Sequence, residues 1–151
     1  MREGTVEGEK IYEYDVDITG LTEYGVSLKG ALSGNETVPP QGARFDVPFE
    51  GHAKGRLSGS VRGVDFLYMR ADGRMELDIR ATIETEDGCR IALSADGVAL
   101  PHQGEPIADL YENVKLTTAF ADLAWVNARQ IWASGTVNLA TGKIHVDAFM
   151  Q

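Results

Sequence analysis

The sequence predicts an all-β protein: a single antiparallel meander closed into a small calycin-like, lipocalin-like β-barrel of about eight strands, with little helix. Apolar and polar residues alternate with a period of two, glycine-containing turns separate the alternating runs, and no linker or change of composition divides the 151 residues. We therefore expect one domain over residues 1–151. A two-sheet sandwich is the alternative, but a closed barrel leaves fewer free strand edges.

Five segments alternate as strands with one buried face do. In Arg74–Thr85, for example, Met75, Leu77 and Ile79 share one face, and charged residues occupy the other. The other four segments are Lys10–Ile18, Cys89–Ala95, Leu110–Phe120 and Lys143–Met150. Turns are expected at 71–73, 86–88, 95–97 and 140–142, each of which ends on glycine. Only Gly20–Leu32 and Ala121–Gln130 could hold a helix, and glycine, β-branched or aromatic residues interrupt both.

Composition makes several classes of function improbable. The formal net charge is −9, and such a field repels phosphate backbones and anionic lipid, so we expect no nucleic-acid or membrane partner. The N-terminus lacks the apolar core of a signal peptide, and no uncharged run is long enough to span a bilayer. The single cysteine excludes an intramolecular disulfide. A cytoplasmic location is expected.

Glycine recurs every four residues in GHAKGRLSGSVRG, at positions 51, 55, 59 and 63. If this segment were one strand, all four glycines would share a face with Ala53, Leu57 and Val61. Two interpretations are compatible. The glycines relieve curvature at barrel corners, or their missing side chains leave room for a ligand inside the barrel.

Asp65 follows this segment, and the register of one hairpin decides which way it points. A three-residue loop would pair Arg70 with Arg74 and place Asp65 opposite Ile79 on the apolar face. A two-residue loop would place it opposite Arg80 on the polar face. Only the first arrangement raises the pKa of the carboxyl toward the value that a general acid or base needs.

Other chemical signals are fewer. The three histidines do not have metal-ligand spacing, and no phosphate loop, dinucleotide fingerprint or nucleophile elbow occurs, so no metal and no cofactor are expected. Trp125, Asn127 and Arg129 alternate and would present a flat ring, an amide and a charge on one face. A core tryptophan beside solvent-facing polar residues is the alternative explanation.

Two long segments resemble the domain-of-unknown-function family numbered 3237. The first, FEGHAKGRLSGSVRGVDFLYMRADGRMELDIRATIETEDG, has the spaced glycines, Asp65-Phe66, and two Asp-Gly turns. The second, LAWVNARQIWASGTVNLATGKIHVDAFM, has the Trp-hydrophobic-Asn pattern through Trp125 and Asn127. The resemblance implies a small antiparallel barrel that often self-associates, and it transfers no established catalytic role. We expect a homodimer, since symmetric dimers are the commonest assemblies.

Two functions are compatible with these features. The first is a cofactor-independent isomerase, cyclase or lyase acting on a small apolar carbonyl or aromatic molecule. Asp65 would transfer the proton and Asn127 would stabilise the oxyanion. Substrate-binding residues would be Tyr14, Leu67, Met69, Leu77 and Trp125. The second function is a non-catalytic small-ligand-binding or carrier protein. A fully packed scaffold is a third possibility.

Overall fold

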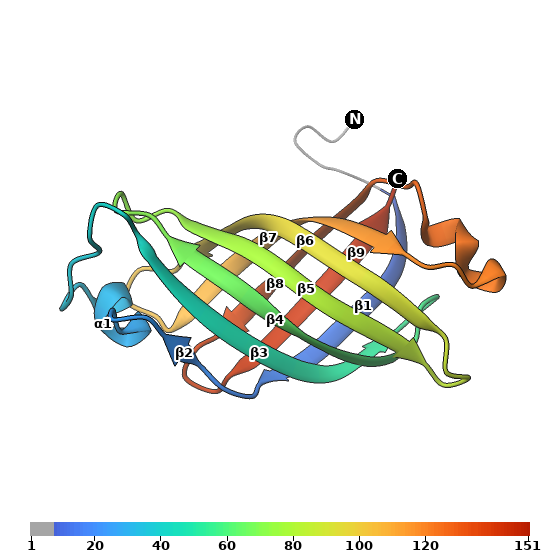
Figure 1. Cartoon of the computed structure of the whole chain (residues 1–151), viewed down its shortest axis with the longest axis horizontal. Coiled ribbons are helices and arrows are strands. Elements are labelled where there is room, and N and C mark those ends of the chain that lie inside the picture. Colours follow the sequence, from blue (N-terminus) through green and yellow to red (C-terminus); the bar gives the residue numbers. More distant parts are fainter. Residues whose placement is uncertain (1–7) are drawn as a thin grey trace.

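The protein is an eight-stranded closed barrel in the computed structural model, which describes residues 8–151. Its strands are β1 (Glu9–Ile18), β2 (Thr22–Glu23), β3 (Ala43–Lys54), β4 (Gly59–Met69), β5 (Met75–Thr85), β6 (Arg90–Pro101), β7 (Ile107–Thr117), β8 (Ile131–Asn138) and β9 (Lys143–Met150). From β3 to β9 each strand pairs antiparallel with the next, and β1 closes the barrel by pairing with both β9 and β3. The short β2 adds to the edge of β3. The predicted meander barrel is confirmed, and the sandwich is set aside (Figure 1).

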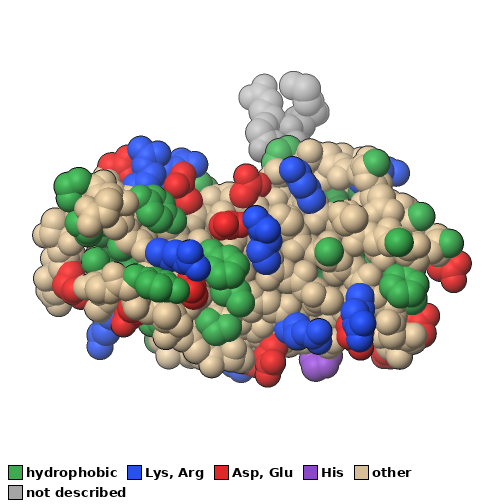
Figure 2. Space-filling model, viewed as in Figure 1, with side chains coloured by type: hydrophobic (Ala, Val, Ile, Leu, Met, Phe, Trp, Pro, Cys, Tyr) green, Lys and Arg blue, Asp and Glu red, His purple; other side chains and the backbone are tan. Residues whose placement is uncertain are grey.

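The alternation seen in the sequence places the apolar faces inside the barrel. In β5, Met75, Leu77, Ile79 and Ile83 are each at most 5% exposed. Burying one such side chain contributes about 1.5–3 kcal/mol, so the interior supplies most of the stability. Ion pairs such as Arg44–Asp46 are scattered over an outer surface of mixed charge and contribute about 0–1 kcal/mol each (Figure 2).

Two short helical segments lie at opposite ends of the barrel (Figure 1). The first overlaps Gly20–Leu32 and the second lies within Ala121–Gln130, the two ranges in which the sequence allowed a helix. Helix α1 (Leu28–Ser33) begins where the Ser27 side chain accepts a hydrogen bond from the Gly30 N–H, and it ends at Gly34, whose φ is 80°. The 3-10 helix η1 (Ala121–Val126) buries Val126 at the other end. Within residues 8–151, no helix has the length and apolar character that a membrane crossing requires.

Two predictions about the chain's path are wrong. Residues 51–63 do not form one strand, because β3 ends at Lys54, β4 begins at Gly59, and Gly51 pairs with Val61 across the hairpin. No turn occurs at 95–97, which lies inside β6; the chain instead turns after His102, whose N–H donates to the carbonyl of Ile107. The turns ending at glycines 73, 88 and 142 are confirmed, and all three residues have positive φ.

The glycines of residues 51–63 relieve crowding between strands, and the interpretation that their missing side chains leave room for a ligand is wrong. A Cβ at Gly51, Gly63, Gly97 or Gly135 would overlap the backbone of the adjacent strand, where the nearest atom in each case is a carbonyl oxygen. Their positions are therefore already occupied by neighbouring main chain. Glycine is required because this sheet brings backbones unusually close together.

Replacing Gly135 by Ala tests this explanation. The added Cβ would overlap the His145 carbonyl oxygen and lie 2.8 Å from Val146 Cα, so we expect the free energy of unfolding to fall by about 1–3 kcal/mol in urea denaturation. Ser134→Ala, at the exposed neighbouring position of β8, should change it by less than about 0.5 kcal/mol. Equal stability of G135A and the wild type would contradict the crowding.

Candidate active site

A cavity of about 360 Å³ lies inside the barrel, toward the end that α1 covers. All eight barrel strands contribute to its wall, and Leu28 and Leu32 of α1 join them at the mouth. The wall is apolar except for Tyr14, Asp65, Glu112 and Thr141. An apolar pocket with a few converging polar groups is the usual form of a small-molecule site, and about 300–1,000 Å³ is the usual size.

Asp65 lies on the cavity wall because the β4–β5 hairpin adopts the register of the three-residue loop. The Arg70 N–H donates to the Arg74 carbonyl oxygen over 2.8 Å, and Asp65 pairs with Ile79. Asp65 Oδ1 accepts a hydrogen bond of 3.0 Å from the Asp78 N–H. Burial raises the pKa of Asp65 to about 7; the Asp78 N–H opposes the shift and the Asp78 charge adds to it.

Glu112 is the second carboxyl of the cavity, and the sequence reasoning missed it. It is 4% exposed and is the only buried charged residue in the described part of the chain. Its Oε2 has no hydrogen-bond partner there. Burial raises the pKa of Glu112 to about 7, and the nearby Asp65 charge contributes. The signal was present, because Glu112 shares the inward parity of Leu110 and Val114 in β7.

Small residues flank Glu112 in its cross-strand row. Gly97 of β6 and Ala133 of β8 pair with it on either side, and Ala148 of β9 and then Tyr12 of β1 continue the same cross-strand row. The buried Tyr12 hydroxyl also has no hydrogen-bond partner in residues 8–151. Burial, together with the Glu112 charge, raises the pKa of Tyr12, so its hydroxyl stays protonated and can donate.

Aromatic rings form one side of the interior. The Tyr12 and Tyr14 rings are stacked with centroids 5.8 Å apart, and Phe49 continues the stack 6.4 Å from Tyr14. Tyr14 and Phe49 both line the cavity. Burial raises the pKa of Tyr14 well above its usual range, and the Glu112 charge adds to this effect. Tyr14 is therefore a neutral hydroxyl and a possible donor to a bound oxygen atom.

The structure brings together four of the seven residues singled out from the sequence: Tyr14, Asp65, Leu67 and Leu77 line the cavity. Met69 is buried on the inward face of β4 but is not part of this wall. Trp125 and Asn127 are in and just after η1, at the opposite end of the barrel.

The expected site roles of Asn127 and Trp125 do not fit their positions. The Asn127 amide accepts from the Thr118 N–H and donates to the Thr118 carbonyl, both over 2.9 Å, so it holds the loop before η1. The Trp125 ring packs under the Arg56 guanidinium, 3.7 Å from the ring centroid. The alternation LAWVNARQIW is thus not a strand face, because part of it is helical.

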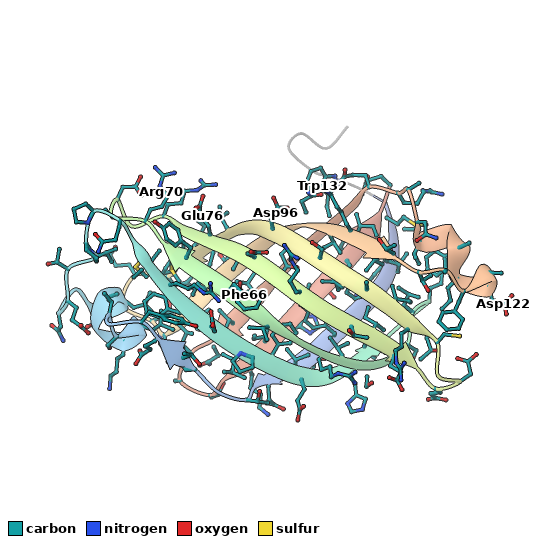
Figure 3. The ribbon with its side chains drawn as sticks, in the orientation of Figure 1. Phe66, Arg70, Glu76, Asp96, Asp122 and Trp132 are labelled. Carbon is teal, nitrogen blue, oxygen red and sulfur yellow. The ribbon has the colours of Figure 1, made fainter. Side chains whose placement is uncertain are left out.

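The histidines contribute nothing to the cavity wall. His145 lies near Glu13 and Asp147 on β1 and β9, and their potential ligand atoms are within 4.8 Å of one another. Ion pairs account for this cluster, because Lys10 Nζ is 2.9 Å from Asp147 and His145 Nδ1 is 2.8 Å from Asp15. The three residues of the cluster are half-buried. Trp132 and Asp96 are exposed on the outside of the barrel (Figure 3).

The pH dependence of stability should reveal the buried carboxyl of Glu112. Its pKa of about 7 is above the value of about 4.3 in the unfolded chain, so its contribution to stability is fully present below pH 4 and is lost as the pH rises through 7. The Glu112→Gln variant lacks this titrating carboxyl. Its free energy of unfolding, relative to the wild type, should therefore increase by on the order of 3 kcal/mol between pH 5 and 8.5.

The control for this measurement is Glu86→Gln, which alters an exposed carboxyl in the β5–β6 turn. Its difference from the wild type should stay constant over the same pH range. A constant difference for Glu112→Gln as well would show that the Glu112 carboxyl titrates as it does in water.

Asn127→Ala should lower the free energy of unfolding by about 1–2 kcal/mol, because two hydrogen bonds to the Thr118 backbone are lost. Asn127→Asp keeps the acceptor and loses the donor. In urea denaturation at pH 7, its free energy of unfolding should therefore lie between those of the wild type and Asn127→Ala. Neither variant should change the affinity for a small aromatic probe. A change of more than threefold in this affinity would show that Asn127 contributes to the binding site.

Comparisons with known proteins agree with this description. A family described as "Protein of unknown function (DUF3237)" matches residues 28–150. No curated protein matches the sequence. A beta-barrel like protein from Acinetobacter baumannii AYE is similar in structure, with a TM-score of 0.75, 20% identity, and coverage of 99% of this chain and 98% of that one.

Two further structures share the fold. A conserved protein of unknown function from Rhodopseudomonas palustris has a TM-score of 0.74 at 19% identity over 99% of both chains. An enzyme from Penicillium herquei has a TM-score of 0.61 at 18% identity over 100% of both chains.

Proposed function

We propose that this chain, which belongs to the DUF3237 family of proteins of unknown function, is a cofactor-independent isomerase, cyclase or lyase. Its substrate is a small apolar carbonyl or aromatic molecule enclosed in the barrel. The observation that carries the proposal is the presence of two carboxyls, Asp65 and Glu112, on the wall of one apolar cavity.

The two carboxyls supply both halves of a proton transfer. With a pKa of about 7 for each, one can be ionised while the other is protonated near neutral pH. The ionised group takes a proton from a carbon next to the substrate carbonyl, and the C–H electron pair moves into an enolate. The protonated group then returns a proton to another carbon. The enzyme's proton count is unchanged, and general acid–base catalysis of this kind contributes about 10²–10⁴-fold.

Tyr14, rather than Asn127, is the residue that stabilises the oxyanion. It lies on the same wall as both carboxyls and remains protonated, so it can donate to the oxygen on which negative charge develops. Leu67 and Leu77 hold the apolar part of the substrate. Enclosure keeps the reacting atoms in place without a covalent intermediate.

A relative supports an enzymatic function at the level of the fold. The Penicillium herquei protein is described as an enzyme, and it shares the barrel at a TM-score of 0.61. The apolar wall alone also fits a ligand carrier, which is the second candidate. A carrier has no use for two carboxyls whose burial costs stability, and this favours catalysis. A cytoplasmic homodimer stays a prediction from the sequence.

The test uses 2-tetralone, a small bicyclic ketone with acidic C–H bonds. We expect the wild type to accelerate exchange of its α-hydrogens in D₂O, followed by proton NMR. Asp65→Asn should slow this catalysed exchange at least tenfold, because the amide cannot accept the proton. The wild-type rate should follow a bell-shaped pH profile centred near 7.

Asp96→Asn is the matched control, since it removes an exposed carboxyl from β6 and should leave the exchange rate unchanged. If 2-tetralone binds and the wild type accelerates nothing, the carrier is the better assignment. If Asp65→Asn exchanges as fast as the wild type, Asp65 is not the base.

A further inference from the structure

We infer that the cavity excludes anions and selects uncharged, flat molecules, so that the substrate is a neutral aryl ketone or phenol rather than a carboxylate or a phosphate ester. This inference rests on the proposed function and narrows its substrate class. It is carried by the charges that line the cavity, by the aromatic rings on one side of it and by one buried carboxylate oxygen that has no hydrogen-bond partner in residues 8–151.

The charged groups of the wall have one sign only. Asp65 and Glu112 line the cavity, and no lysine, arginine or histidine of residues 8–151 does. A bound carboxylate would lose its hydration without meeting a cation, and it would face two carboxyls in a medium of low dielectric constant. An uncharged ligand avoids both penalties.

Two basic side chains of the barrel strands near the mouth are already paired with surface carboxylates. Lys143 of β9 is exposed and is 2.6 Å from Asp17, and Arg44 of β3 is 2.7 Å from Asp46. Both cations are therefore paired on the outer surface. The net charge of −9 adds a long-range field that also disfavours the approach of an anion.

The aromatic side of the cavity fits a flat ring. Tyr14 and Phe49 both line the cavity, and their rings are nearly parallel, inclined by 17°. A neutral aromatic ring packs favourably against such rings, either stacked on a face or against an edge. The volume of about 360 Å³ is near the lower limit for small-molecule pockets and suits a ligand of one or two fused rings.

One buried polar atom of the wall gives the ligand an orientation. Glu112 Oε2 has no hydrogen-bond partner in the described part of the chain. Leaving such an atom unpaired is costly; a ligand hydroxyl can donate to it, and a ligand carbonyl oxygen can accept from it when the carboxyl is protonated. The inferred ligand is therefore neutral and flat, with one or two oxygen atoms.

The experiment compares 2-acetylnaphthalene with 2-naphthoate, which have the same ring system and differ by an uncharged or a charged substituent. Isothermal titration calorimetry at pH 7.5 should give the ketone at least tenfold tighter binding to the wild-type protein. In the double variant Asp65→Asn/Glu112→Gln, naphthoate should bind at least tenfold more tightly than to the wild type. The preference for the ketone over naphthoate should therefore fall at least tenfold in this variant.

Glu86→Gln/Asp96→Asn is the control, because it removes two carboxylates from exposed positions outside the cavity and should leave the ratio of affinities within twofold of the wild type. Naphthoate binding to the wild type as tightly as the ketone would overturn the inference. So would an unchanged naphthoate affinity in the double variant, or failure of both probes to bind the folded wild type.

These outcomes are separate from those of the exchange experiment. Selective binding of the ketone together with unaffected exchange in Asp65→Asn would retain the selectivity and reject Asp65 as the base. Conversely, loss of exchange in Asp65→Asn with equal binding of the two probes would retain the proposed function and reject the exclusion of anions.

Discussion

The hydrogen bond from the Arg70 N–H to the Arg74 carbonyl oxygen accompanies the loop length that decides whether Asp65 lies inside this barrel. The three-residue loop of the β4–β5 hairpin sets the register of both strands. A shift by one residue would turn Asp65 outward and move Leu67 and Met69 away from the core. Because the apolar faces of β4 and β5 must both be buried, the register that forms the core is also the one that places a carboxyl in the cavity.

The site opposes the stability of the fold that contains it. Asp65 and Glu112 occupy positions where aliphatic side chains would pack, and within residues 8–151 Glu112 Oε2 and the Tyr12 hydroxyl have no hydrogen-bond partner. The remaining inward residues offset this cost, since every barrel strand contributes apolar side chains to the core. A group whose pKa is shifted by burial in this way is typical of functional sites, where reactivity is retained at the expense of stability.

The sequence contained enough information for the barrel and for part of the site. Alternation in segments such as Arg74–Thr85 identifies inward residues without further context, and glycines at positive φ mark three turns. The glycines at 51, 55, 59 and 63 led to the wrong prediction of one strand, because a four-residue spacing does not indicate where a hairpin reverses the chain. Asn127 misled because its partner, the Thr118 backbone, is supplied by the tertiary fold. Glu112 was recognisable by parity, but its proximity to Asp65 depends on the closure of the sheet.

Helix α1 has a consequence for how quickly the cavity can exchange its contents. A helix of six residues has little stability of its own, so its position depends on the burial of Leu28 and the packing of Leu32 against the cavity wall. A guest bound as proposed would contact both leucines, since they line the cavity. Its residence time would then depend on how firmly these two side chains hold the short segment at the mouth.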